Sequence, residues 1–531
     1  MIKKTLFLAF ALSFTITSYC QGNHSQKLDT LFKFYQKQNL FNGSVLVSQK
    51  GKILLEKGYG LKNAQSQTIN DANSIFQIYS VTKTFTSTVI LKLVELKKLS
   101  LTDKLSKFYP DFPKGDSITI EHLLTHTSGI YDGDNMPVQN ETSLVTFLKT
   151  KPLDFLPGTQ WNYSNSGYRL LGYIIEKVVG ISYEKAVKKY IFNPLQMTHS
   201  GFDFKYLLNK DKTTGYEIFS EKMKKPAIVY EPPGPFAAGG IYSTIKDLYK
   251  YYKGLSTYKL LSKQTLDKAY TPFKNNYGYG WIILPVFDKL TIGHSGAAAG
   301  FRSNFIQIPT DDVCIVLLSN TENELDKITS NVEKVLYNKP FKIPVVINIS
   351  KEQLKLYRGT YEINNSLVIY VYVENSKLIV QPSKQPKNIL YPEKQNLFYV
   401  EELNSYIHFE KNHSNEIDTL IFNQEGQDVK AKRIYPSWEI IGSSTENGWD
   451  GLGLKLSKTD TVNIWAIKNI QLKDGEIKFR FNRDWTINLG INSGNVLKQD
   501  GENIKIENGN YNIILDLTDD ENPKYKISKQ N

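Results

Sequence analysis

A serine and a lysine stand together at the start of a long apolar helix, and this pairing limits how the chain can fold around them. Ser80-Val-Thr-Lys83 is followed by an apolar-periodic run to about Leu99. Residues three apart share one helix face, so the ammonium lies within reach of the hydroxyl. A neighbouring amine activates a serine without a histidine, and the free N–H groups of a helix start stabilise nearby negative charge. Ser-x-x-Lys recurs by chance among 65 basic residues, so it needs support elsewhere.

Two later segments supply that support. After the turn at 156–158, Tyr163-Ser-Asn165 precedes an apolar-periodic helix from Tyr168 to about Val179. Residues two apart in an extended segment point the same way, so Tyr163 and Asn165 are expected to face one cleft. Further on, 290–296 reads as a strand that ends in small residues, 296–300, beside which a substrate backbone has room to lie.

These segments together resemble the serine β-lactamase and penicillin-binding-protein superfamily. The motifs are Ser-x-x-Lys, Tyr-x-Asn and His294-Ser-Gly296 in this order, with His122-Leu-Leu-Thr-His126-Thr-Ser-Gly-Ile130 and Gly239-Gly-Ile-Tyr-Ser-Thr244 as further matches. The likeness covers about 28–340 and is strongest to the class C branch with its D-alanyl-D-alanine carboxypeptidases, D-aminopeptidases and esterases. It implies an α/β (α+β) domain, an antiparallel sheet flanked by helices.

The resemblance also implies a role for each matching residue. Ser80 is the acylated nucleophile, Lys83 its proton partner and Tyr163 the general base and acid. The groups implied to bind substrate are the side chains or backbone of Asn165, His294, Gly296 and Ala297, with the N–H groups of Ser80 and Ala297 forming the oxyanion hole. A tyrosine with an ordinary pKa of ~10 acts as a base only if Lys83, alone or together with a charged His294, stabilises its phenolate. The sequence leaves open whether Lys83 or Tyr163 takes the proton.

His294 departs from the Lys-Thr-Gly strand that lactamases usually carry. A histidine with its ordinary pKa of ~6.5 is mostly neutral at pH 7 and holds a carboxylate weakly. We therefore expect an exported hydrolase that acts through an acyl-serine intermediate. The expected substrates are D-amino-acid peptides or amides, peptidoglycan-derived peptides included, or esters. β-Lactams are ranked below these substrates. The alternative is a noncatalytic penicillin- or glycan-binding protein that keeps the pocket. No cofactor and no metal are expected.

Two competing interpretations of single residues stay open at this point. Gly293-His-Ser295-Gly-Ala297 after an apolar run is typical of the nucleophile elbow of α/β-hydrolases, although an elbow leads into a helix and a strand is expected here. His122 and His126 have the spacing of a zinc pair but lack the glutamate of a metalloprotease helix, which favours a structural role. Four aromatic residues are assigned to the core or the cleft with equal weight: Trp161, Tyr242, Trp281 and Phe301.

The N-terminus predicts export. Residues 1–20 have the form of a secretory signal peptide, with Lys3-Lys4, then the apolar run 6–16, then 17–20. The apolar run is too short to span a membrane. Cleavage after Cys20 is favoured over its lipidation, which predicts a periplasmic, outer-membrane-associated or secreted protein. Cys314 then stays as a buried strand cysteine. The net charge of +12 comes from lysines spread without a patch, so nucleic acid is not expected as a partner.

The length of 531 residues predicts about three domains. The hydrolase is assigned to 21–345, and Pro340 and Pro344 mark a linker. Short alternating strands predict a lipocalin-like β module at 350–435. Residues 436–531 hold four of six tryptophans and resemble the domains of SusE/SusF-type outer-membrane starch-binding lipoproteins over 437–528. This implies a β-sandwich with glycan contact, in which Trp449 and Trp485 are expected to be core residues.

Overall fold

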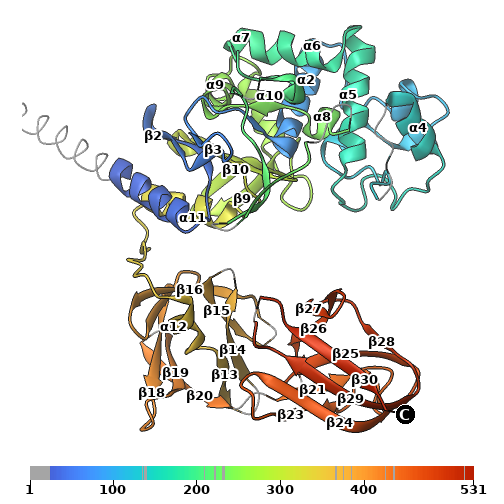
Figure 1. Cartoon of the computed structure of the whole chain (residues 1–531). Helices are drawn as coiled ribbons and strands as arrows, with labels where there is room; N and C mark the ends of the chain where they lie inside the picture. Colours follow the sequence, from blue (N-terminus) through green and yellow to red (C-terminus); the bar gives the residue numbers. More distant parts are fainter. Residues whose placement is uncertain are drawn as a thin grey trace, which may run out of the picture. The chain divides into compact units, whose positions relative to one another are not determined.

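The structure is a computed structural model that divides into two compact units, 1–341 and 342–531 (Figure 1). It describes residues 24–530 apart from 134–135, 137–139, 209, 221–222, 230–233, 365–366, 375, 384, 425, 435–436, 483 and 520. The predicted signal peptide and Cys20 therefore lie outside the described residues. None of the helices within the described ranges is long and apolar enough to cross a membrane.

A six-stranded antiparallel sheet forms one layer of the first unit. Its order is β2-β1-β12-β11-β10-β9, so strands from the two ends of the unit pair in the middle, with Gly43 opposite Ser319. The bounds are β1 Gly43–Gln49, β2 Lys52–Tyr59, β9 Ile282–Val286, β10 Lys289–Ala298, β11 Phe301–Ile308 and β12 Val313–Ser319. The predicted antiparallel sheet is confirmed.

Helices flank this sheet on both sides. Asn304 on β11 donates to Thr329 of α11 (Asp326–Leu336) at 2.9 Å, which places α11 and the neighbouring helix 24–37 on one face. The other face carries the helical layer. Its elements are α2 Thr82–Glu95, α3 Ile120–Leu124, α4 Glu141–Lys149, α5 Asn165–Val179, α6 Tyr183–Val187, α7 Asn193–Leu195, α8 Phe236–Gly239, α9 Ile245–Ser256 and α10 Lys263–Ala269.

The helix after the Ser-x-x-Lys pair lies at the centre of this layer. Nearly all side chains of α2 are buried, polar ones included, because other elements surround it on every side. It ends at Glu95, four residues before the predicted end, since Lys97 adopts a left-handed conformation (φ +55°) that stops the helix. α5 begins at Asn165, earlier than predicted, because the Ser164 side chain caps its start by accepting from the Gly167 N–H.

The second unit contains a closed barrel. Eight antiparallel strands run in sequence order around it, and the first pairs with the last. They are β13 Gly359–Asn364, β14 Leu367–Glu374, β15 Lys377–Pro382, β16 Asn388–Lys394, β17 Leu397–Val400, β18 Ser405–Lys411, β19 Ile417–Gln424 and β20 Gln427–Ile434. The predicted all-β module is confirmed as a barrel with its own apolar core.

A ten-stranded antiparallel sheet follows the barrel. Its edge strands, β22 Leu454–Lys455 and β23 Ser457–Lys458, are separated only by the buried Leu456, so the sheet curls until its two edges meet. The other strands are β21 Trp438–Ile441, β24 Ile464–Leu472, β25 Gly475–Phe481, β26 Asp484–Ser493, β27 Val496–Gln499, β28 Ile504–Ile506, β29 Gly509–Asp516 and β30 Lys524–Lys529. The resemblance to starch-binding lipoproteins stays a prediction, because a β fold alone does not test it.

The barrel and this sheet share an apolar interface. Val368, Tyr370 and Tyr372 of β14 point out of the barrel into the core of the second sheet, and the Tyr370 and Phe481 ring centroids lie 6.0 Å apart. The boundary between the two compact units lies at 341–342, near the predicted linker at Pro340 and Pro344. The two predicted C-terminal modules therefore form two sheets of one unit.

Candidate active site

Ser80 lies where a short 3₁₀ turn, η1 (Tyr79–Val81), runs into the N-terminus of α2. The residue before it, Tyr79, is buried with a φ of +42°, a region that non-glycine residues rarely adopt. Such local strain is held only by the surrounding structure. The sharp turn leaves Ser80 partly exposed while both of its neighbours are buried.

Lys83 lies beneath Ser80 with no exposed surface. Its Nζ is 3.1 Å from Ser80 Oγ and 2.8 Å from both Asn165 Oδ1 and the Ala238 carbonyl oxygen. Burial lowers the pKa of Lys83 to about 7, although the Asp132 carboxylate acts in the opposite direction. The amide and carbonyl oxygens can only accept hydrogen bonds, so the lone pair of a neutral amine is left to face the Ser80 hydroxyl. This geometry suits proton transfer from Ser80 to Lys83.

Tyr163 completes the group around Ser80. The Lys83 ammonium lies 4.7 Å from the centre of its ring. Burial raises the pKa of Tyr163, and a hydrogen bond with Ser80 only partly offsets this. The residue is therefore a neutral phenol at neutral pH, which favours Lys83 as the base and Tyr163 as a proton donor. Tyr163 and Asn165 do not lie in one extended segment as expected, because Asn165 is already the first residue of α5.

His294 is buried beside Tyr163, with 6.2 Å between the two ring centroids. Its side chain accepts from the Tyr277 hydroxyl at Nε2, 2.9 Å away, and donates from Nδ1 to the Ser295 carbonyl at 2.6 Å. Burial, aided by the positive charge of Lys83, lowers the pKa of His294 to about 3. His294 therefore adds no charge that could stabilise a Tyr163 phenolate, because both of its ring nitrogens are engaged inside the protein.

Strand β10 runs close beside the nucleophile. A Cβ on Gly296 would lie 2.2 Å from the Ile78 carbonyl oxygen, so glycine is required for this approach. Ser303 on β11 donates to the same carbonyl at 2.8 Å. Ala297 follows on the exposed face of β10, near the hairpin turn. The roles of Gly296 and Ala297 in binding substrate stay predictions.

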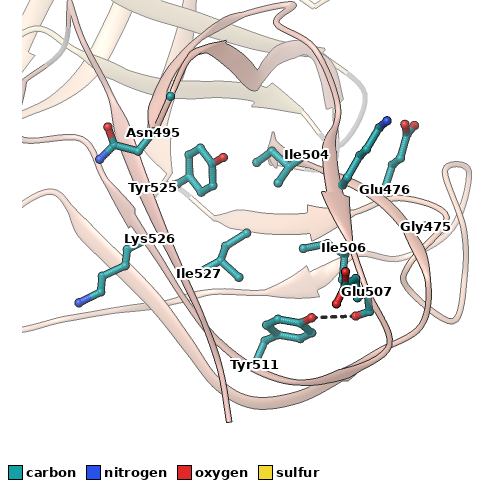
Figure 2. A pocket seen from close by; sticks show the side chains of 12 residues that line it. Gly475, Glu476, Asn495, Ile504, Ile506, Glu507, Tyr511, Tyr525, Lys526 and Ile527 are labelled. Carbon is teal, nitrogen blue, oxygen red and sulfur yellow. Dashed lines mark hydrogen bonds between the residues drawn. The ribbon is translucent and has the colours of Figure 1, made fainter.

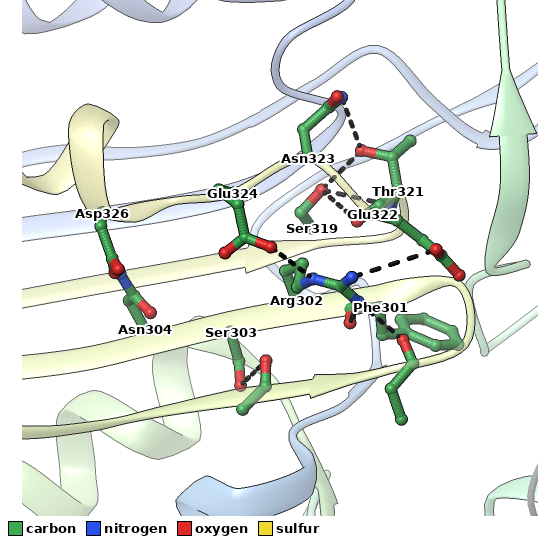
Figure 3. A network of polar contacts seen from close by, with 12 residues as sticks. Phe301, Arg302, Ser303, Asn304, Ser319, Thr321, Glu322, Asn323, Glu324 and Asp326 are labelled. Carbon is green, nitrogen blue, oxygen red and sulfur yellow. Dashed lines mark hydrogen bonds and ion pairs between the residues drawn. The ribbon is translucent and has the colours of Figure 1, made fainter. Parts of the chain in front are cut away.

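The cation nearest to Ala297 along the sheet is occupied by other groups. Arg302, opposite Ala297 on β11, donates to the carbonyls of Ala298 and Phe301 at 2.9 Å each (Figure 3). It also forms ion pairs with Glu322 at 3.9 Å and Glu324 at 3.5 Å. Arg302 therefore does not replace the lysine that lactamases carry on this strand.

Asp132 is a site residue that the sequence analysis missed. It accepts from the Asn165 and Ser166 N–H groups at 2.9 and 2.7 Å, and so satisfies the start of α5. The available signal was indirect: the first turn of α5 holds no acidic residue of its own, and Asp132 follows shortly after the motif at 122–130.

The other candidates have structural positions. Ser295 lies within a strand that leads into another strand, which excludes a nucleophile elbow. His122 accepts from the Thr119 N–H and His126 from the Ser164 N–H, so the two serve separate contacts. The described part of the chain contains no cluster of three or more metal-ligating side chains. Core positions are held by Tyr242, Trp281, Phe301 and Cys314, whereas the half-buried Trp161 lies beside His126.

A separate hollow lies in the second unit. It has a volume of about 1020 Å³ between β28 and strands β29 and β30, with Ile504, Ile506 and Ile527 among its lining (Figure 2). Tyr511 at its lower side donates to the Glu507 carbonyl at 2.8 Å. The hollow contains none of the residues grouped around Ser80.

Comparisons with known proteins identify a family and several relatives. The profile of the family described as Beta-lactamase matches residues 28–336. Penicillin-binding protein 4* of Bacillus subtilis is 26% identical over an alignment of 452 residues, which covers 77% of this chain and 99% of that protein. The octameric penicillin-binding protein homologue from Pyrococcus abyssi has a TM-score of 0.56 at 27% identity and covers 77% of this chain and 99% of that one. A class C β-lactamase has a TM-score of 0.54 at 26% identity, with 60% and 97% covered.

The longer of these matches reach beyond the first unit. Residues 1–341 are under two thirds of the chain, so a share of 77% includes part of the second unit as well. The likeness therefore extends past the matched profile.

Proposed function

This chain belongs to the β-lactamase family, and we propose that it is an active serine hydrolase that forms an acyl intermediate on Ser80. The observation that carries the proposal is the environment of Lys83. Among its hydrogen-bond partners in the described part of the chain, only the Ser80 hydroxyl can donate a proton. A pKa of about 7 leaves a large neutral fraction of Lys83 at neutral pH. A noncatalytic binder would have no use for such a base.

The proposed acylation proceeds as follows. Ser80 Oγ attacks the substrate carbonyl while its proton passes to Lys83 Nζ. The oxyanion is held by the N–H groups of Ser80 and Ala297, a contribution of about 100- to 1,000-fold in rate. Tyr163, as a neutral phenol, gives its proton to the leaving group. It then takes back from Lys83 the proton that Lys83 received from Ser80. Water then attacks the acyl-enzyme by the reverse route and releases the acid.

The neutral state of His294 affects which substrates we propose. β-Lactams and peptides ending in D-alanine both carry a carboxylate near the scissile bond, and neither His294 nor Arg302 is free to bind it. We propose that D-amino-acid amides and esters without this carboxylate are the preferred substrates. Peptides ending in D-alanine, peptidoglycan-derived ones among them, should react less efficiently, and β-lactams should be hydrolysed poorly.

A substrate panel tests this proposal. Purified protein is assayed on short acyl nitrophenyl esters, D-aminoacyl amides, D-Ala-D-Ala peptides and a chromogenic cephalosporin, each against Ser80→Ala. Labelling with a fluorophosphonate reports the nucleophile independently of the substrate. We expect turnover and labelling that both vanish in Ser80→Ala. Wild-type protein that is folded yet neither labelled nor active on any member would favour the binding protein.

An aromatic surface in the second unit favours glycan contact as a second function. Trp485 is 39% exposed, and its ring lies 6.0 Å from that of the half-buried Trp449, so the expectation that both are core residues is wrong. Arg480 stacks on Trp485 at 5.2 Å and pairs with Glu439 at 2.6 Å. An exposed indole fixed from behind is suited to stacking on sugar rings.

Glycan contact is best tested on the full chain, because residues 436–531 share a core with the barrel. Binding to starch, other glucans and peptidoglycan is compared between wild type and Trp485→Ala. Retention of wild type alone supports the proposal, and equal behaviour of the two proteins opposes it. Such contact would suit an exported protein at the cell envelope, which remains our proposal for its location.

A further inference from the structure

The two residues that flank Tyr163 in the chain are both held by His126. The Asn162 N–H donates to the His126 carbonyl oxygen and the Ser164 N–H donates to His126 Nδ1, each at 3.0 Å. The imidazole also packs on Tyr163, with 4.4 Å between ring centroids. One side chain and its own carbonyl thus fix the backbone on either side of the phenol.

Asp132 holds the next two residues. Its Oδ2 accepts from the Asn165 N–H at 2.9 Å and from Asn165 Nδ2 at 3.3 Å. Its Oδ1 accepts from the Ser166 N–H at 2.7 Å and from the Ser166 hydroxyl. The contact with Nδ2 orients the Asn165 amide, whose Oδ1 in turn accepts from Lys83.

We propose that His126 and Asp132 are positioning residues that hold Tyr163 and Asn165 in register with Ser80 and Lys83. The segment 126–132 then acts as a template for the segment 162–166, and its two ends contact four of that segment's five backbone N–H groups. This inference rests on the proposed acyl-serine function, since it concerns the same site.

The local structure of His126 is suited to this role. Its φ of +59° is left-handed, which turns both its carbonyl and its ring toward the same segment. Because Nδ1 accepts a hydrogen bond, the proton of the neutral ring is on Nε2, and this buried atom has no hydrogen-bond partner among the residues that the structure describes. The ring therefore adopts the tautomer that serves the Tyr163 segment and leaves its own N–H unpaired.

Asp132 has an electrostatic effect in addition to its contacts. Its negative charge favours the protonated form of Lys83 and so raises the pKa of that lysine. Titratable groups face Lys83 from four elements of the fold: the segment 126–132, the segment before α5, α5 itself and β10. They are His126, Asp132, Tyr163, Tyr168 and His294. Burial keeps both histidines neutral, which leaves Asp132 as the nearby anion of this set.

Two substitutions at His126 separate positioning from packing. Asn tolerates positive φ and places an oxygen near the position of Nδ1, whereas Leu keeps apolar volume but accepts no hydrogen bond. We expect His126→Leu to lower kcat for a nitrophenyl ester by about 10- to 100-fold with little change in KM. His126→Asn should recover most of that loss. Thermal unfolding of the same samples shows that both variants are folded.

Substitutions at Asp132 separate its charge from its contacts. Asp132→Asn removes the charge and keeps one of the two accepting oxygens. Because the charge acts on Lys83, the pH profile of kcat/KM should shift to lower pH by about half a unit or more. Asp132→Ala also removes the contacts and should lose about a further 10-fold in kcat. Asp247→Asn is the matched control, because that buried carboxylate lies in another helix, α9, accepts from the His199 N–H, and does not act on Lys83. It should lower thermal stability without moving the profile.

The outcomes also separate this inference from the function on which it rests. Folded wild type that is neither labelled by a fluorophosphonate nor active would overturn the acyl-serine function itself. If the wild type is active, either of two results would overturn the positioning role. One is an equal kcat for His126→Leu and His126→Asn. The other is a pH profile for Asp132→Asn that does not differ from that of the Asp247→Asn control.

Discussion

At the scale of single residues, the pKa of Lys83 determines the pH at which Ser80 becomes a nucleophile. Burial holds this pKa at about 7, so the neutral base increases as pH rises through that value. We expect kcat/KM for a nitrophenyl ester to rise with an apparent pKa of about 7 between pH 5 and 9. Lys83→Met should lower it by about 100-fold or more. A rate that is flat across pH 7 would contradict Lys83 as the base.

His294 offers a test of substrate charge. Replacement by lysine adds a cation at the border of the cleft, and a charge-assisted hydrogen bond to a carboxylate contributes about 1.5–3 kcal/mol. We expect His294→Lys to raise the rate on a cephalosporin relative to that on a neutral ester by about 10-fold. His294→Gln, which remains neutral, is the control. An unchanged ratio in folded His294→Lys would show that the strand does not contact the carboxylate.

The same residue shows where sequence reasoning ends. The motifs identify Ser80, Lys83, Tyr163 and Asn165, because their spacing and order are local properties of the chain. The state of His294 depends on Tyr277, which comes from another segment and carries no motif. Its burial, and hence its lowered pKa, is a tertiary property that no pattern around 294–296 contains.

At the scale of elements, α11 carries a buried acid that makes stability depend on pH. Glu333 is 5% exposed, and burial raises its pKa to about 7 from an ordinary value of 4.5. Between these values the unfolded chain releases a proton that the folded protein keeps, so stability is full below pH 4.5 and falls as pH rises to about 7.

Glu333→Gln removes this dependence. We expect the variant to be more stable than wild type at pH 8, by up to about 3 kcal/mol, and equal to it at pH 4. Urea unfolding at both pH values measures the difference. The exposed carboxylate of Glu324 on the preceding loop supplies the control, Glu324→Gln. A gain of equal size at both pH values would point to packing instead of ionisation.

Elements of this protein follow the sequence closely where periodicity is strong. Strand β10 lies where the run 290–296 predicts a strand, and α2 and α5 lie where apolar periodicity predicts helices. Helix ends differ, since they depend on single residues: a left-handed Lys97 stops α2, and the Ser164 cap starts α5. The capping serine was visible in the sequence, but its place beside Tyr163 was interpreted as extended backbone.

At the scale of the whole molecule, β14 joins two sheets that were expected to be separate domains. Its sequence, 367–373, is an unbroken apolar run instead of an alternating one, and such runs are typical of strands buried on both faces. Ile369 and Val371 fill the barrel, while Val368, Tyr370 and Tyr372 pack against the second sheet. The signal for one combined unit was therefore present in the sequence.

A shared core requires the two sheets to unfold together. We expect calorimetry to show one transition for the first unit and one for barrel and second sheet combined. Tyr370→Ala should lower the second transition by removing about 3–5 kcal/mol of packing, and should leave the first unchanged. Leu403→Ala, on the same barrel at a side chain that is 58% exposed, is the matched control and should move neither. If Tyr370→Ala split the second transition into two, the barrel and the sheet would be separable domains in contact, because a common core cannot lose one half while the other half remains folded.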